Sequence, residues 1–344
     1  MPFDFGLSAD QASIEDLFSS FFANESPTAV VRAAEPLGFS PALWAALRGF
    51  DATGIGAPAA DGGGGATLVD LVVVAEALGH AIAPVPLVEH VVASRAHPTA
   101  AVVSGEQIAT IALRPASADG VWRLVPGGAV ADVVIGVDGL DLVATQSEAP
   151  DVAPVNHACA PLADRSARAA TRTVIGAATD FDVILDEWRV LTAAALVGIA
   201  AASLELALAY VLERQQFGRP IGSYQALQHG LADFPGLIDG ARFLTHKAAW
   251  AADGGRRGAG AMVDIDNGEV VDAAVLASMA FVQAAEAAAV CTDRGLHYHG
   301  GYGFSAEYDI QLYFRRARGW ANVLGDPARE RLRLADLLWP VGAR

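Results

Sequence analysis

Apolar residues recur at helical spacing through the whole carboxyl-terminal part of the chain, and this pattern constrains the fold more than any other feature. Alanine is abundant there, and its small side chain lets helices pack closely. The pattern therefore predicts a four-helix bundle. We expect four helices separated by turns that contain Gly or Pro: Val190–Arg214, Tyr224–Ala252, Asp272–Arg294 and Pro327–Leu338.

Two regions with different residue patterns precede this part of the chain. Between Ile14 and Gly105 the apolar residues again follow a helical period, which predicts a helical amino-terminal domain. Residues 107–184 instead carry short runs rich in β-branched residues, bounded by Gly, Asp or Pro, which predict a small antiparallel sheet or barrel. We therefore expect a mainly α protein with a small β domain. The predicted domains are 1–105 (helical), 106–184 (a shortened β domain) and 185–344 (the four-helix bundle).

Composition excludes several classes of function. Apolar residues make up 53% of the 344 residues, which is enough for a sizeable core. The formal net charge of −16 repels phosphate backbones and anionic membrane surfaces, so we expect neither nucleic acid nor a membrane as a partner. The two cysteines form no CxxC pair, and the longest uncharged apolar run, Val190–Leu204, is shorter than the roughly 20 residues of a membrane span. The amino terminus shows no secretory signal, so we expect a soluble cytoplasmic protein.

The most specific motif joins the first two predicted bundle helices. Arg214 ends one helix, Phe217 and Gly218 form a turn, and Gln225 lies near the start of the next helix. The planar guanidinium of an arginine can bond two oxygens of a pyrophosphate at once, and a helix start offers free backbone N–H groups. From residue types alone, a plain helical hairpin with a surface arginine explains the segment equally well.

A second motif is rich in glycine and follows the third predicted bundle helix. Gly300 and Gly301 would let a ligand lie directly against the backbone, although a glycine-rich turn that only closes a helix has the same sequence. His297 and His299 are two residues apart and have no third ligand nearby. We therefore expect no metal site here.

Together the two motifs resemble the acyl-CoA dehydrogenases, flavoproteins that use FAD to introduce a double bond next to a thioester. The segment Gly54–Pro58 and the run Glu76–Gly79 also resemble the family's amino-terminal turn and helix. The resemblance is strong from Arg189 to Arg318 and thin between Gly105 and Asp180. It implies a helical amino-terminal domain, a middle β domain and a carboxyl-terminal four-helix bundle that also forms the subunit interface.

The resemblance also implies a set of cofactor-binding residues. In the family, the Arg and Phe of the first motif and the Gln of the next helix contact the FAD of a neighbouring subunit, and the paired glycines lie against its diphosphate. The family usually has Gln at the position of His297, which can still donate a hydrogen bond. The implied FAD-binding residues are Arg214, Phe217, Gln225, His297, Gly300 and Gly301.

The catalytic base of the family has no counterpart in a gap-free alignment. The family reaction uses a carboxylate to remove the α-proton of the acyl-CoA while the β-hydride passes to the flavin. The two positions at which members carry that Glu are Leu324 and Trp188 here, and neither side chain accepts a proton. Glu187 and Asp326 are weak candidates for a relocated base if the register shifts. Both also have an ordinary explanation, Glu187 as a helix-start carboxylate and Asp326 as a helix cap.

The middle segment also lacks the runs that hold the flavin ring in the family. The chain therefore resembles most closely the short, degenerate subunits of heteromeric bacterial acyl-CoA dehydrogenases, which pair with a complete subunit, notably in steroid side-chain breakdown. This resemblance predicts an auxiliary subunit that lacks the usual Glu, completes the FAD site of a longer partner subunit and acts on an acyl-CoA thioester. Two alternatives stay open: a self-sufficient homo-oligomeric enzyme with a relocated carboxylate base, and a flavin-free binding or scaffold relative.

Overall fold

The computed structural model describes residues 6–254, 262–264 and 270–339. Its amino-terminal part is helical, as the periodicity predicts, and a short 3₁₀ turn, η1 (Ala59–Asp61), precedes its longest buried helix. The α-helices of this part are α1 (Ala9–Glu25), α2 (Thr28–Ala33), α3 (Pro41–Gly49), α4 (Leu68–His80), α5 (Leu87–Ala96) and α6 (Ala100–Val103).

The middle segment forms two small sheets. The first has four strands in the order β1 (Ala109–Ile111), β3 (Val133–Asp138), β4 (Asp141–Gln146) and β6 (Thr171–Ala177). The second pairs β2 (Val121–Val125) with β5 (Ala163–Ser166) in antiparallel fashion. The expected antiparallel pairing is wrong for β1, which runs parallel to β3.

The sequence pattern does not reveal β5 and β6. β6 is an edge strand whose residues are largely exposed, and β5 alternates small residues with charged ones. Arg165 of β5 is nevertheless buried, because its guanidinium donates hydrogen bonds to the backbone oxygens of Gly128, Ala131 and Ser147. Such strands lack the apolar alternation on which strand prediction depends.

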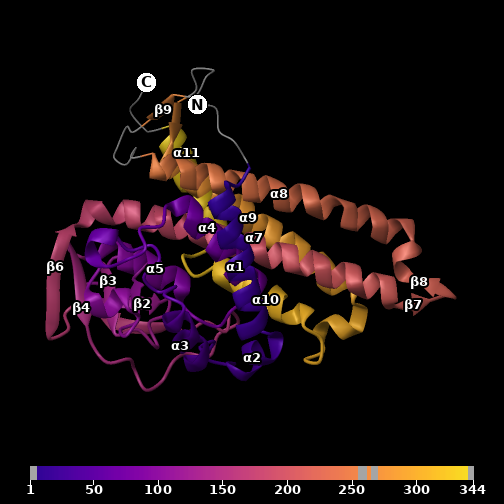
Figure 1. Cartoon of the computed structure of the whole chain (residues 1–344), viewed down its shortest axis with the longest axis horizontal. Coiled ribbons are helices and arrows are strands. Elements are labelled where there is room, and N and C mark those ends of the chain that lie inside the picture. Colours follow the sequence, from indigo (N-terminus) through magenta and orange to yellow (C-terminus); the bar gives the residue numbers. More distant parts are fainter. Residues whose placement is uncertain (1–5, 255–261, 265–269, 340–344) are drawn as a thin grey trace.

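The carboxyl-terminal part is built on three long helices that lie side by side (Figure 1). α10 packs on both α7 and α9, and α11 packs on α9. The elements are η2 (Ala178–Asp180), α7 (Phe181–Glu213), β7 (Gln215–Gln216), β8 (Arg219–Pro220), η3 (Ile221–Ser223), α8 (Gln225–Asp253), β9 (Met262–Asp264), β10 (Val270–Asp272), α9 (Ala273–Tyr298), η4 (Gly300–Phe304), α10 (Ile310–Ala321) and α11 (Pro327–Leu338). α7 and α9 are long and apolar enough to span a membrane by length and composition, but more than half of each apolar window is buried in the molecule, as in core helices.

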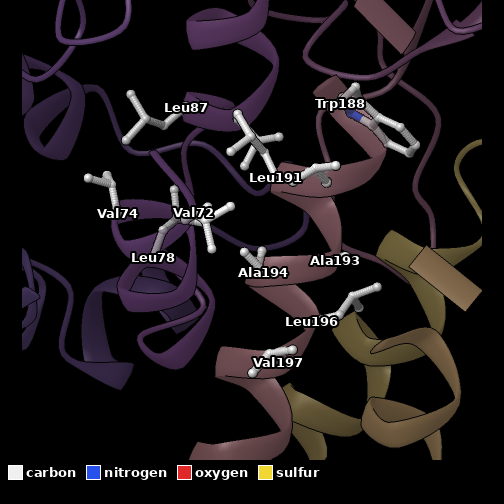
Figure 2. Packing of buried hydrophobic residues seen from close by; sticks show 14 of the residues in the cluster. Val72, Val74, Leu78, Leu87, Trp188, Leu191, Ala193, Ala194, Leu196 and Val197 are labelled. Carbon is white, nitrogen blue, oxygen red and sulfur yellow. The ribbon is translucent and has the colours of Figure 1, made fainter. Parts of the chain in front are cut away.

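α7 is the central helix of the molecule: it packs against α9 and, as Figure 2 shows, against α4. Two glycines let the backbones of α4 and α7 approach closely. A Cβ built on Gly79 would lie 1.9 Å from the carbonyl oxygen of Ala195, and one on Gly198 would lie 2.1 Å from that of Glu76. Neither position therefore tolerates a larger side chain without separating the two helices. This contact joins the amino-terminal helices to the bundle.

A buried histidine on α5 makes the stability of the fold sensitive to pH. His90 has no exposed surface, and its Nδ1 accepts a hydrogen bond of 3.0 Å from the backbone N–H of Ala109. Burial lowers the pKa of His90 from 6.5 to about 4. The unfolded chain therefore binds a proton at this residue below pH 6.5, while the folded chain does so only near pH 4.

We predict that protonation of His90 alone lowers the free energy of unfolding by about 2 kcal/mol as the pH is lowered from 7 to 5, while the raised pKa of the buried Asp186, about 6, acts in the opposite direction. Burial lowers the pKa of His246 to about 4 as well, so that residue adds a similar loss. In the variant His90→Gln, the decrease between these two pH values should be smaller by about 2 kcal/mol. Urea unfolding of both proteins at both pH values measures the difference. An equal decrease in both proteins would contradict the assignment.

Candidate functional site

The residues of the two sequence motifs meet at one end of the bundle, where the β7–β8 hairpin and η4 lie close to the end of α7 (Figure 1). An open groove of about 550 Å³ lies between them. It is lined by the end of α7, the hairpin and the turn after α9: Tyr210, Arg214, Gln216, Ile221, Tyr298, His299, Gly300, Gly301, Tyr302, Ser305 and Glu307.

The hairpin begins where α7 ends. Arg214 is the C-cap of α7 and leaves the helical conformation with ψ near 122°, while its N–H still donates to the carbonyl oxygen of Tyr210 at 2.9 Å. The N–H of Ile221 donates to the Arg214 carbonyl oxygen at 2.8 Å and closes the hairpin. The guanidinium of Arg214 is thereby directed to the groove rather than along the helix.

The tip of the hairpin exposes an aromatic ring. Phe217 has a φ of 54° and is 92% exposed, and Gly218 follows with a φ of 82°. A left-handed conformation costs a non-glycine residue free energy, and so does an aromatic ring left in water. Gln225 is the first residue of α8 and is also exposed. Phe217 and Gln225 lie beside the groove and do not line it.

The paired glycines present bare backbone to the groove. Gly300 has a φ of 61°, which favours glycine by itself. Gly301 has no such φ, and a Cβ built on Gly301 would meet no atom within 4 Å. The packing of this chain alone therefore does not require glycine at residue 301. His297 is exposed on α9 and does not line the groove.

Aromatic rings form one wall of the groove, and sequence reasoning missed them. We call Tyr210, His299, Tyr302 and Tyr308 the aromatic wall: the first three line the groove, and Tyr308 contacts all three rings without lining it. The guanidinium carbon of Arg214 lies 5.3 Å from the centroid of the Tyr302 ring. One signal in the sequence pointed to the wall: Tyr210 lies four residues before Arg214 and hence on the same helix face.

A cation, a bare stretch of backbone and flat rings around one open groove can bind a ligand that carries phosphate and a planar ring system. An arginine fork suits a diphosphate, and aromatic faces suit a heterocycle. The carboxylate of Glu307 at the rim adds a hydrogen-bond acceptor.

At the other end of α7, the first usual base position holds a buried indole. Trp188 is 1% exposed and donates its Nε1–H to the Oε1 of Glu89 over 3.2 Å. The second usual position, Leu324, is half-buried against the core, and its backbone oxygen accepts a hydrogen bond of 2.6 Å from Arg114. Neither position carries a side chain that can accept a proton.

The two substitute bases have structural partners. Glu187 is 5% exposed and forms an ion pair of 2.9 Å with Arg95, whose Nη1 also donates to the backbone oxygens of Gly56 and Ala66. Glu187 therefore lies inside α7 and is not a solvated helix-start carboxylate. The Oδ1 of Asp326 caps α11 by accepting a hydrogen bond from the Ala328 N–H at 2.9 Å. Asp326 is therefore a helix cap, which is the ordinary explanation for this residue.

A carboxyl group that sequence reasoning missed lies beside Trp188. Glu89 lines a cavity of about 70 Å³ together with Trp188 and Arg316. Burial raises the pKa of Glu89, while the hydrogen bond from Trp188 acts in the opposite direction. In the part of the chain that the structure describes, no cationic side chain lies within ion-pair distance of Glu89. A single Glu in the apolar sequence of α5 carries no pattern that could have identified it.

Comparison with known proteins finds the same family at both ends of the chain. The family model "Acyl-CoA dehydrogenase, N-terminal domain" matches residues 8–110, and "Acyl-CoA dehydrogenase, C-terminal domain" matches residues 181–336. The curated "Acyl-CoA dehydrogenase IpdE2" of Mycolicibacterium smegmatis is 34% identical over 320 residues, which are 90% of this chain and 91% of that protein. The protein of the same name from Mycobacterium tuberculosis is 30% identical over 338 residues, 96% of this chain and 98% of that protein.

Solved structures agree with the fold. The Tcur3481–Tcur3483 steroid ACAD superposes with a TM-score of 0.80 at 26% identity, covering 96% of this chain and 97% of that chain. The ChsE4–ChsE5 complex from Mycobacterium tuberculosis superposes with a TM-score of 0.84 at 23% identity, covering 99% of this chain and 100% of that chain. At 23% identity, the similarity to the ChsE4–ChsE5 complex shows a shared fold only.

The ion pair between Arg95 and Glu187 yields a test of the role of Glu187. We predict that Glu187→Gln lowers the free energy of unfolding by about 2–3 kcal/mol, because it leaves the largely buried Arg95 without its countercharge. Asp326→Asn is the matched control and should change the free energy of unfolding by only a few tenths of a kcal/mol, since Asn caps a helix about as well as Asp. Urea unfolding of the three proteins measures both effects. Unchanged stability of Glu187→Gln would show that the ion pair is not structural.

Proposed function

Because the chain belongs to the acyl-CoA dehydrogenase family, we propose that it is an auxiliary subunit of a heteromeric, FAD-dependent acyl-CoA dehydrogenase. In this proposal it completes the FAD site of a longer partner subunit and contributes no catalytic base. The residues that would meet the partner's FAD are Arg214, Phe217, Gln225, His297, Gly300 and Gly301.

The observation that carries the proposal is the contrast between the two ends of α7. At the carboxyl end, Arg214 and Gly301 line an open groove, and Phe217 extends into solvent. Towards the amino end, the buried Trp188 occupies the position where a family member can carry its base. The chain thus keeps a surface that its own packing does not use, while neither usual base position carries a side chain that accepts a proton.

The groove fits the diphosphate half of FAD. Arg214 would bind phosphate oxygens with its planar fork, and Gly300 and Gly301 would let the diphosphate approach the backbone, where no Cβ stands in the way. When bound, the flavin of FAD accepts the hydride from the thioester substrate. In the proposal this chain binds and orients that cofactor, and the proton is removed by the partner.

The size of the cavity beside Trp188 argues against a second, complete active site in this chain. Its volume of about 70 Å³ is far below the roughly 300–1,000 Å³ of pockets that bind organic ligands. A flavin ring together with an acyl chain would not fit there without movement of the surrounding helices.

The partner and substrate classes follow from the relatives. The Tcur3481–Tcur3483 steroid ACAD is named for two proteins, and its structure superposes on 96% of this chain. We therefore infer a hetero-oligomer with a longer acyl-CoA dehydrogenase subunit and a steroid-derived acyl-CoA thioester as substrate. Leu212 and Phe304 are 68% and 76% exposed near the groove, and a partner would cover this apolar surface.

Glu89 favours a second candidate, a self-sufficient enzyme with a relocated base. Its carboxyl lies next to Trp188, and burial raises its pKa in the direction that suits a general base. It is a better candidate than Glu187, which pairs with Arg95, or Asp326, which caps a helix. The FAD content of the chain alone decides between the two candidates.

We predict that the chain purified alone carries no stoichiometric FAD, because half of the cofactor site would belong to the partner. Co-expression with a longer acyl-CoA dehydrogenase subunit encoded nearby should yield a yellow complex that contains both chains. The visible spectrum and the FAD-to-protein ratio measure this. A stoichiometric yellow protein from the chain alone would favour the second candidate, and Glu89→Gln should then abolish bleaching by substrate.

We predict that Arg214→Ala in this chain weakens FAD binding by the complex about ten- to a hundredfold, the loss expected for a charged hydrogen bond to phosphate. Arg219→Ala is the matched control, because Arg219 lies in the same hairpin but stacks on Tyr224 at 4.1 Å and does not line the groove. Titration of the apo complex with FAD measures both dissociation constants. Equal affinities for wild type and Arg214→Ala would refute the role of Arg214.

A further inference from the structure

We propose that Tyr302 is a positioning residue, whose ring holds the guanidinium of Arg214 in the groove before a ligand or a partner arrives. The inference rests on the proposed function, because it assumes that Arg214 meets the diphosphate of the partner's FAD. It adds a residue that the paired-glycine motif does not specify, since Tyr302 stands between Gly301 and Gly303 and is not itself one of the glycines.

The guanidinium of Arg214 lies over the ring of Tyr302. The guanidinium carbon lies 5.3 Å from the ring centroid, within the range of a cation–π interaction. Across the described ranges, no carboxylate forms an ion pair with Arg214. The guanidinium is thus held by an aromatic face and not by an anion, which leaves its N–H fork free for phosphate oxygens.

Tyr302 is held in turn by the rest of the aromatic wall. Its ring lies 5.2 Å from that of Tyr308, at an interplanar angle of 36°. The Tyr308 ring meets those of Tyr210 and His299 edge-on, each with centroids 6.1 Å apart. Tyr210 and His299 stack face to face at 4.1 Å and 22°. The half-exposed Tyr302 therefore rests on a continuous set of ring contacts.

The wall is anchored in two bundle helices. His299 is buried at the end of α9, and its Nδ1 lies 2.7 Å from the carbonyl oxygen of Gly295. A carbonyl oxygen only accepts, so Nδ1 carries the proton and donates it. Burial lowers the pKa of His299, which favours the neutral ring. The Tyr210 hydroxyl donates to the His299 carbonyl oxygen at 3.3 Å and links α7 to α9.

This anchoring matters because a free arginine side chain samples many rotamers. Ordering it on binding costs free energy, and a side chain already held in place loses less. A cation–π contact at a partly exposed site is weak, so its loss should weaken ligand binding only two- to fivefold. Tyr302 is 45% exposed and makes its contacts at the surface, so its replacement should leave the fold intact.

The first test uses the chain alone and no ligand. NMR relaxation of the Arg214 Nε–Hε group should show a restricted side chain in the wild type and in Tyr302→Phe, which keeps the ring. In Tyr302→Leu the group should become mobile, and its ring-current shift should disappear. Phe304→Leu, which removes another aromatic ring from the same turn, is the control. It should change neither the mobility of the Arg214 Nε–Hε group nor its ring-current shift. An equally restricted Arg214 in Tyr302→Leu would overturn the proposal.

The second test measures the coupling between the two residues in the complex. Tyr302→Leu should weaken FAD binding two- to fivefold, whereas Tyr302→Phe, which keeps the ring, should bind FAD with wild-type affinity. In an Arg214→Met background, Tyr302→Leu should have no further effect, since no guanidinium remains to be positioned. A merely structural role of Tyr302 would produce the same loss with or without Arg214, and that result would also overturn the proposal.

The two tests separate this inference from the proposed function. If Arg214→Met leaves FAD binding unchanged while the NMR signals respond as expected, the proposed function is wrong and the contact between Tyr302 and Arg214 is real. If Arg214→Met weakens FAD binding but Tyr302→Leu changes neither the mobility of Arg214 nor the affinity, the proposed function stands and Tyr302 is not a positioning residue.

Discussion

The close contact between α4 and α7 is the constraint on which the rest of the structure depends. Gly79 and Gly198 bring the two backbones so near that a methyl group at either position would overlap a carbonyl oxygen of the other helix. The buried Val72 and Leu78 of α4 then pack against Leu191 and neighbouring residues of α7 (Figure 2). α7 is thereby fixed along its apolar middle, and both of its ends take their positions from that contact.

The length of α7 separates the two functions that a complete family member combines. Trp188 and Arg214 are 26 residues apart, which corresponds to roughly 40 Å of helix at about 1.5 Å per residue. A change at the base position therefore has no direct effect on the groove. The proposed auxiliary role depends on this separation, because it assigns the base to the partner and keeps Arg214 at the groove. The geometry of one rigid helix makes an auxiliary subunit physically reasonable.

The sequence predicted the helices whose apolar period is clear, and it failed where charged residues are buried. α7 begins at Phe181, earlier than the expected Val190, because its first turns carry acidic and basic residues that break the apolar pattern. Two of those residues, Glu187 and Arg189, are buried in ion pairs, and Arg189 meets Glu330 at 2.9 Å. A countercharge that is distant in the sequence leaves no local signal. The same reason explains why Glu187 could be taken for a helix-start residue.

The candidate site was predicted in part. Arg214, Gly300 and Gly301 line one groove, whereas Phe217 extends into solvent at the hairpin tip and does not line it. The aromatic wall escaped prediction since it joins α7, the end of α9 and the following turn. These features share a physical cost: an exposed Phe217 in a left-handed conformation and an uncovered groove are unfavourable in water. A surface that covered them would remove the part of that cost that comes from exposure to water, while the backbone conformation of Phe217 would keep its own.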